Sequence, residues 1–122
     1  MEINNYTNDA LELLKELIAI PSVSRDEWKA TDKLAEYLNR WNLPFGREGN
    51  NLWVGCQDWD NNRPTVMLNA HIDTVKPVAS WTRDPFTPAQ EGDLLYGLGA
   101  NDCGGGLVEI EIGRAGQQEC RD

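Results

Sequence analysis

The chain has 122 residues and a formal net charge of −9 at pH 7, with 20 acidic side chains against 11 basic ones. This length allows one domain at most, and 40% hydrophobic with 25% charged residues is an ordinary globular composition, which excludes a disordered or fibrous chain. The acidic excess is spread over both halves of the sequence, which argues against binding to nucleic acid or to an anionic membrane surface.

No part of the sequence approaches the roughly 18 consecutive apolar residues of a membrane helix, and the first residues lack the pattern of a secretory signal. We therefore expect a cytoplasmic protein. Its cysteines, Cys56, Cys103 and Cys120, are widely spaced and odd in number. They fit neither a disulfide framework nor a paired Cys-x-x-Cys zinc site, so reduced thiols are expected.

Two helices are predicted in the first third of the chain. Leucine and isoleucine side chains recur at helical spacing over residues 8–20, and Pro21 closes that segment. A second helix is predicted over residues 26–41, opened by a capping box in which Ser24 and Glu27 satisfy the first turn. Its apolar positions are sparser, which indicates a helix that lies on a sheet with much of its surface in water.

Strands are predicted after the second helix. Residues 52–56 and 65–70 indicate a hairpin around the polar turn 58–63, and the second strand is nearly all apolar, as in a sheet covered on both faces. Residues 94–96 form another short strand after the long loop 77–93. These elements predict an α/β fold with a mixed sheet flanked by helices.

A histidine and an aspartate follow the predicted strand 65–70. In an extended chain His71 and Asp73 point the same way, because side chains repeat with a period of two. A carboxylate that holds an imidazole fixes its tautomer and raises its basicity, as is usual for a metal-binding histidine. The alternative is a histidine paired with a neighbouring acid at a strand end, and an H-x-D triplet alone does not exclude it.

A second candidate residue, Asp102, lies in the glycine-rich stretch 97–106. Glycine permits tight turns and close backbone approach, so an acid in this setting can be held near a ligand or a metal. The alternatives are a flexible linker or a phosphate-binding loop. The spacing matches neither G-x-x-x-x-G-K-[ST] nor G-x-G-x-x-G, which disfavours a nucleotide site.

Four stretches combine these features in one order: Ile20-Pro21-Ser22-Val23-Ser24, Asn69-Ala70-His71-Ile72-Asp73-Thr74-Val75, Trp81-Thr82-Arg83-Asp84-Pro85-Phe86 and Gly99-Ala100-Asn101-Asp102. Together they resemble the start of a family of dinuclear zinc-dependent amidohydrolases that includes acetylornithine deacetylase, succinyl-diaminopimelate desuccinylase, carboxypeptidase G and aminoacylase. The resemblance spans residues 8–108 and implies the N-terminal portion of a zinc-exopeptidase-like catalytic domain.

The resemblance implies a role for each candidate residue. His71 would ligate one zinc ion, Asp73 would be the supporting catalytic acid that orients it, and Asp102 would bridge two zinc ions, with cobalt or manganese as substitutes. The implied reaction is hydrolysis of the amide bond of an N-acyl amino acid. The glycine-rich stretch lacks the lysine often found two residues after the bridging acid, which looks most like the acetylornithine deacetylases of arginine biosynthesis.

The family's remaining ligands are missing from this sequence, which has one histidine and no Glu-Glu pair to supply a general base and a further ligand. The family also continues into an apolar helix where the alternating residues 107–113 here predict a short strand. We therefore divide the chain into residues 1–108, the catalytic-domain part, and a divergent tail, 109–122. Glu109 and Glu111 are only remote candidates for substitute ligands.

These departures predict a truncated, inactive form of a deacetylase of amino-acid biosynthesis. A second copy in a homo-oligomer, or an absent C-terminal part, would supply the missing ligands. The expected partner is a small N-acyl amino acid, with neither nucleic acid nor membrane. The alternative from another class is a non-catalytic fold fragment that serves as an assembly or regulatory module.

Overall fold

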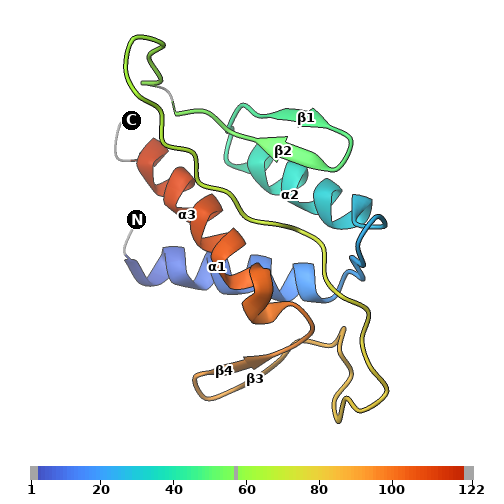
Figure 1. Cartoon of the computed structure of the whole chain (residues 1–122). Coiled ribbons are helices and arrows are strands. Elements are labelled where there is room, and N and C mark those ends of the chain that lie inside the picture. Colours follow the sequence, from blue (N-terminus) through green and yellow to red (C-terminus); the bar gives the residue numbers. More distant parts are fainter. Residues whose placement is uncertain (1–2, 57, 120–122) are drawn as a thin grey trace.

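Helices and short antiparallel strands make up the part of the chain that this computed structural model describes, residues 3–56 and 58–119. Their order is α1 (Ile3–Ile18), α2 (Trp28–Arg40), β1 (Gly46–Glu48), β2 (Asn51–Trp53), β3 (Ala89–Glu91), β4 (Leu94–Tyr96), the glycine turn (Ala100–Gly105) and α3 (Gly106–Glu119) (Figure 1). The predicted α/β composition is thereby confirmed. Among these residues no helix is both long and apolar enough to cross a membrane.

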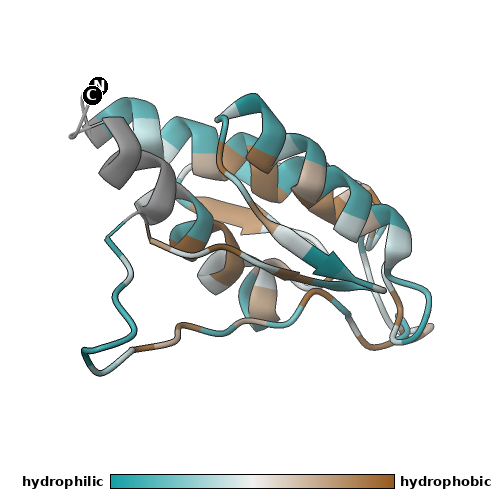
Figure 2. Cartoon of the chain, turned by 90° about the horizontal axis from the view of Figure 1, so that it is seen from above, coloured by the Kyte–Doolittle hydropathy of each residue, from teal (hydrophilic) through white to brown (hydrophobic). Residues whose placement is uncertain are grey.

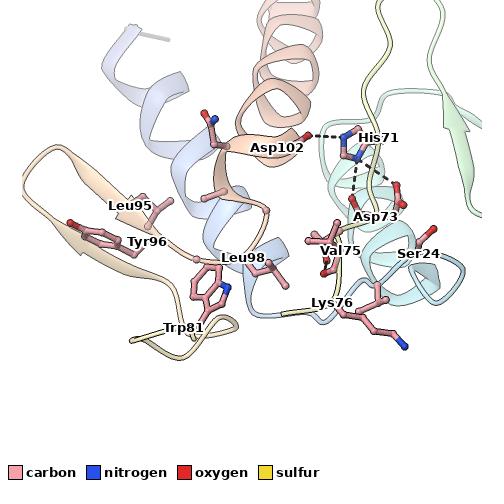
Figure 3. Close-up of a pocket in the computed structure, with 16 residues that line it drawn as sticks. Ser24, His71, Asp73, Val75, Lys76, Trp81, Leu95, Tyr96, Leu98 and Asp102 are labelled. Carbon is pink, nitrogen blue, oxygen red and sulfur yellow. Dashed lines mark hydrogen bonds and ion pairs between the residues drawn. The ribbon is translucent and has the colours of Figure 1, made fainter. Parts of the chain in front are cut away.

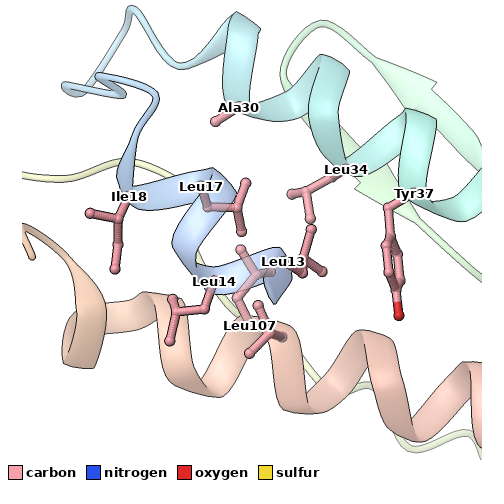
Figure 4. Close-up of a cluster of buried hydrophobic side chains, with 9 residues drawn as sticks. Leu13, Leu14, Leu17, Ile18, Ala30, Leu34, Tyr37 and Leu107 are labelled. Carbon is pink, nitrogen blue, oxygen red and sulfur yellow. The ribbon is translucent and has the colours of Figure 1, made fainter. Parts of the chain in front are cut away.

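The apolar stripe of α1 is the centre of the core. Its side chains meet those of α2 and of the start of α3 (Figure 4). The cluster consists of Leu13, Leu14, Leu17, Ile18, Ala30, Leu34, Tyr37, Leu107 and Val108. Burial of an aliphatic side chain contributes roughly 1.5–3 kcal/mol to the free energy of unfolding. Because its buried side chains contact those of both α2 and α3, α1 is the element that joins the other two helices. The helix predicted over 8–20 is confirmed, although it begins earlier, at Ile3, and ends at Ile18.

The second helix is also confirmed, but its predicted capping box is wrong. The helix begins at Trp28 with Glu27 as its N-cap residue, and no side chain caps it. Arg25, at a φ of 76°, turns the chain before the helix, which leaves Ser24 outside the first turn. Ser24 instead donates its backbone N–H to the carbonyl of Thr74, at 3.2 Å.

The strands of the described residues form two separate antiparallel hairpins in place of one mixed sheet. In the first, Gly46 of β1 lies opposite Trp53 of β2. In the second, Ala89 of β3 lies opposite Tyr96 of β4. The strand predicted at 94–96 is therefore confirmed, whereas the one predicted at 52–56 is shorter and pairs with the residues before it.

The buried strand predicted over residues 65–70 does not form. The segment is irregular, and its apolar side chains are open to solvent, with exposed fractions of 87% for Val66, 82% for Met67 and 70% for Leu68. Figure 2 shows the hydrophobic colouring of this stretch, which follows a hydrophilic loop. A strand is stable only beside a hydrogen-bonded neighbour, and none of the described strands pairs with this segment.

The strand predicted over residues 107–113 is wrong, because α3 covers this stretch and continues to Glu119. Leu107 and Val108 are 8% and 3% exposed, and they pack against α1. Packing of these two side chains outweighs both the alternating pattern and the helix-weakening Gly113. Of the predicted tail 109–122, residues 120–122 lie outside the described part of the chain.

Candidate metal centre

The segment that carries His71 is held in place through Thr74. Thr74 and Val23 form a parallel β-bridge. The backbone N–H of Thr74 donates to the carbonyl of Ser22, at 2.8 Å, and that of Ser24 donates to the carbonyl of Thr74, at 3.2 Å. The residues that follow α1 thus hydrogen-bond to Thr74, three residues beyond His71. These bonds restrict the position of the imidazole.

The glycine turn brings Asp102 to the same place. Gly99 has a φ of 76°, in the left-handed region that favours glycine, and a Cβ at this position would lie 2.6 Å from Cγ2 of Thr74. Gly104 donates its N–H to the carbonyl of Gly99 at 2.9 Å, and a Cβ there would lie 2.6 Å from that oxygen. Both glycines are therefore required by close packing, and the turn lies directly against Thr74.

The loop that contains Trp81 joins this arrangement. Leu98, just before the glycine turn, donates its N–H to the carbonyl of Pro85 at 2.8 Å. Backbone bonds and close packing thus link the four stretches that carry the family resemblance, the third of them through Leu98, the residue that precedes the fourth. Together they line an open cleft of about 940 Å³, whose lining includes Trp81 and Tyr96.

His71, Asp73 and Asp102 meet in this cleft (Figure 3). Nδ1 of His71 lies 2.9 Å from the backbone carbonyl oxygen of Asp73, and Nε2 lies 2.9 Å from Oδ1 of Asp102. The Asp73 carboxylate is 3.4 Å from Nδ1. The three residues proposed from sequence are therefore neighbours, although Asp102 follows His71 by 31 positions. The main-chain oxygen of Asp73 is closer to the ring than its carboxylate is.

The contact with Asp102 also sets the electrostatics of the imidazole. The hydrogen bond to Asp102 raises the pKa of His71 above 6.5, and the bond to the Asp73 carbonyl adds to this effect. The side chains are open to water, with exposed fractions of 51% for His71 and 88% for Asp102. Solvent screens an ion pair of this kind, so its contribution to the free energy of unfolding is small.

The donor atoms suit a zinc ion but form only part of a site. An imidazole nitrogen and a carboxylate oxygen are both zinc ligands, and a hydrogen bond from Nδ1–H to a carbonyl leaves the Nε2 lone pair free to bind a metal. A structural zinc site has four protein ligands and a catalytic one commonly has three. The described residues hold no cluster of three or more histidine, cysteine or acidic side chains suited to a metal.

Other predicted residues lie away from this pair. Glu109 and Glu111 are on α3 and do not line the cleft. Burial raises the pKa of Glu111, as expected for a carboxyl against a helical core. Cys103 is half-buried beside Asp102 and, like Cys56, is outside any disulfide of the described residues, whereas Cys120 lies outside those residues.

The sequence analysis missed two residues that line the cleft, Lys76 and Tyr96. Lys76 follows His71 by five positions, so its closeness in the sequence to a candidate ligand could have identified it as a residue of the cleft. Tyr96 ends a strand predicted correctly, but the side that its ring faces depends on the hairpin β3–β4 and on Arg83, whose guanidinium lies 3.8 Å from the ring centre. Neither the pairing of β3 with β4 nor the contact with Arg83 can be predicted from the residues next to Tyr96 in the sequence.

Comparison with known proteins gives a family match over this part of the chain. A model of the peptidase family M20/M25/M40 matches residues 67–110, the stretch that holds His71, Asp73 and Asp102. The chain belongs to this family. Succinyl-diaminopimelate desuccinylases are among the relatives: that of Anaplasma marginale is 34% identical over 103 residues, and that of Xylella fastidiosa is 32% identical over 112.

These alignments take in most of the chain but a minor part of each relative. They cover 78% of the chain and 26% of the desuccinylase from Anaplasma marginale. For the protein from Xylella fastidiosa they cover 86% and 29%. The chain thus spans less than a third of the length of these curated relatives.

Substitution of Gly99 tests the close approach of the glycine turn to Thr74. We expect Gly99→Ala to lower the free energy of unfolding by about 1–3 kcal/mol, because it combines a positive φ with the contact at Thr74. Gly49→Ala is the matched control, since Gly49 has a φ of 58° and no atom within 4 Å of an added Cβ. Urea unfolding followed by circular dichroism measures both variants. Equal losses would show that the packing at Thr74 contributes nothing.

Asp102→Asn tests the electrostatics of the single histidine. In chelator-treated protein we expect this variant to lower the pKa of His71, measured by NMR titration of the imidazole, because the largest cause of its elevation is removed. A raised pKa favours folding fully below pH 6.5 in the parent chain, and this contribution is lost as the pH rises through the folded-state pKa. Asp93→Asn, on an exposed turn, is the control and leaves the titration unchanged.

Proposed function

We propose that this chain provides the N-terminal part of the catalytic domain of a metal-dependent amidohydrolase that cleaves the amide bond of an N-acyl amino acid. The observation that carries the proposal is the pairing of His71 and Asp102, 2.9 Å apart in the cleft that the resembling stretches line. The M20 family match over residues 67–110 supports it.

Each residue of the pair has a defined task in this proposal. His71 binds zinc through Nε2, and the carbonyl of Asp73 fixes the ring by accepting the Nδ1–H. One oxygen of Asp102 faces His71, and the largely exposed carboxylate leaves the other oxygen for a second cation. When bound, zinc supplies a water of lowered pKa and polarises the carbonyl of the amide.

This chain alone supplies an incomplete catalytic set. Among the residues that the structure describes, the acidic side chains that line the cleft are Asp73 and Asp102, which the proposal already uses, so none of these residues is left there as a general base. A site with two protein ligands also binds a metal weakly. We therefore propose that the 122-residue chain by itself binds zinc weakly and turns over little or no substrate.

The proposal also specifies the acyl group of the substrate. The variant glycine turn led us to expect N-acetylornithine and arginine biosynthesis, but the relatives reported above are named succinyl-diaminopimelate desuccinylases. Acetyl and succinyl substrates share the same scissile amide. We propose N-succinyl-diaminopimelate as the first substrate to test, with N-acetylornithine as the comparison.

Zinc binding by the chain tests the half-site directly. We expect native mass spectrometry and equilibrium dialysis to detect weak binding of zinc that His71→Ala or Asp102→Asn abolishes. Asp73→Asn is expected to weaken binding by about tenfold, because the carbonyl that holds the ring stays in place while a nearby carboxylate is lost. Asp93→Asn leaves binding unchanged. Equal zinc binding by the parent chain and the Asp102→Asn variant would contradict the assigned site.

A chimaera tests hydrolysis. Residues 67–110 of this chain replace the aligned stretch of the Anaplasma marginale desuccinylase, which supplies the rest of the domain. We expect zinc-dependent release of succinate from N-succinyl-diaminopimelate, and a loss of more than about a hundredfold in kcat/KM in the same chimaera with His71→Ala. The control is the chimaera with Asp93→Asn.

Both substrates are assayed with each chimaera. A folded chimaera that binds zinc but hydrolyses neither substrate would contradict the proposed activity. It would favour instead the non-catalytic module that the missing ligands suggest.

A further inference from the structure

The side chain of Arg83 contacts both strands of the hairpin β3–β4. Its guanidinium donates to Glu91 of β3 in a fork, with Nη1 at 2.8 Å from Oε1 and Nη2 at 3.1 Å from Oε2. The same guanidinium lies over the ring of Tyr96 of β4, 3.8 Å from the ring centre. A planar guanidinium can form both contacts at once, whereas a lysine ammonium group cannot. Arg83 therefore joins the loop that carries it to the whole hairpin.

The loop before the hairpin, residues 77–88, depends on this contact for its position. In the described part of the chain, two sets of hydrogen bonds tie the loop to the residues that follow it. One runs from the N–H of Leu98 to the carbonyl of Pro85, and the other is the fork from Arg83 to Glu91. A segment held by few bonds is easily displaced. Loss of the fork would leave the loop with one of these two ties.

Two aromatic side chains of these segments line the cleft. Trp81 precedes Arg83 by two positions, and Tyr96 lies under its guanidinium. Figure 3 shows both rings across the cleft from His71. Arg83 and Glu91 are themselves outside the lining of the cleft. An effect of this ion pair on the cleft therefore passes through the two rings.

The ion pair is exposed, so its main effect is on geometry. The side chains of Arg83 and Glu91 are 39% and 58% exposed, and solvent-exposed pairs contribute little to the free energy of unfolding. The hydrogen bonds from Arg83 lower the pKa of Glu91 below 4.5, so the carboxylate is charged and paired at neutral pH. A fork that bonds both oxygens fixes the orientation of the two side chains.

We propose that Arg83 is a positioning residue for the cleft. Its fork to Glu91 and its stacking on Tyr96 hold the aromatic wall formed by Trp81 and Tyr96, against which the carbon chain of the substrate packs. The contact with substrate rests on the proposed function, whereas the placement of the two rings does not. The proposal adds to the metal pair a residue that acts on substrate binding alone.

Fluorine NMR of the 122-residue chain tests the placement of the rings without metal or substrate. The chain has three tyrosines, so with fluorotyrosine the resonance of Tyr96 is assigned by Tyr96→Phe. We expect Arg83→Gln to move this resonance and to leave that of Tyr37 in place, because the cation over the Tyr96 ring is lost. With fluorotryptophan, the same variant is expected to move the Trp81 resonance, assigned by Trp81→Phe.

Three further variants separate the fork from charge and from general surface effects. Arg83→Lys keeps the charge but loses the fork and the flat stacking, so it is expected to behave as Arg83→Gln does. Glu91→Gln is expected to move the same two resonances, although Glu91 touches neither the cleft nor its metal pair. Arg63→Gln is the matched control, since Arg63 is an exposed arginine bonded to Asp60 at 3.2 Å, away from the cleft. Urea unfolding is expected to give the same midpoint for Arg83→Gln and Arg63→Gln.

The chimaera described above tests the contact with substrate. With N-succinyl-diaminopimelate we expect Arg83→Gln to raise KM by about fivefold or more and to leave kcat within about twofold, because the wall binds ground state and transition state alike. Zinc affinity is expected to stay unchanged, since the metal pair lies across the cleft. Arg63 lies outside residues 67–110, so the control in the chimaera is Asp93→Asn.

The opposite results would overturn the proposal. Unmoved resonances of Tyr96 and Trp81 in Arg83→Gln, or parent-like spectra of Arg83→Lys, would exclude the positioning role. A fall of kcat together with the urea midpoint would show a structural role instead, and an unchanged KM in an active chimaera would exclude the contact with substrate. A chimaera that hydrolyses neither substrate would contradict the proposed activity, and the spectra of the chain would still decide the role of Arg83.

Discussion

The backbone hydrogen bonds between Thr74 and the stretch Ser22–Ser24 are the constraint on which the rest of the site depends. They join the end of α1 to a segment that has no regular structure before it. Thr74 is also the surface against which Gly99 packs, so one residue positions both the histidine side and the aspartate side of the cleft. The positions of His71 and Asp102 thus depend first on the backbone hydrogen bonds of Thr74 and on the packing of Gly99 against Thr74. Their own side chains determine only the remaining distance.

Local patterns predicted α1 and α2 well, whereas the roles assigned to His71, Asp73 and Asp102 stay predictions. The leucines of α1 repeat at helical spacing, and this information is contained within a single segment. Asp102 was found because glycines surround it, and those glycines are present for packing reasons that the structure makes visible. The neighbourhood of His71 and Asp102 could be expected only through the family resemblance, since no local rule links positions so far apart.

The wrong strand predictions, at residues 65–70 and 107–113, share a physical cause. The structure of each segment depends on which other segments of the chain it can pair with or pack against. Residues 65–70 read as a strand from composition, but a strand requires a neighbour that the described chain does not offer. Residues 107–113 alternate as an exposed strand would, yet the apolar stripe of α1 provides a surface for Leu107 and Val108, and the helix forms. Sequence gives the tendency of a segment, whereas the available contacts decide which tendency is realised.

The cover that α3 provides for α1 has a consequence for synthesis of the protein. Leu13 and Leu14 lie in the first helix of the chain, whereas Leu107, which packs in the same cluster, lies in the last one (Figure 4). At about 5–20 residues per second, a ribosome needs roughly 5–20 seconds to extend the chain between these positions. During that interval the leucines of α1 have emerged without their final cover, so the nascent chain presents an apolar helix face to which a chaperone can bind.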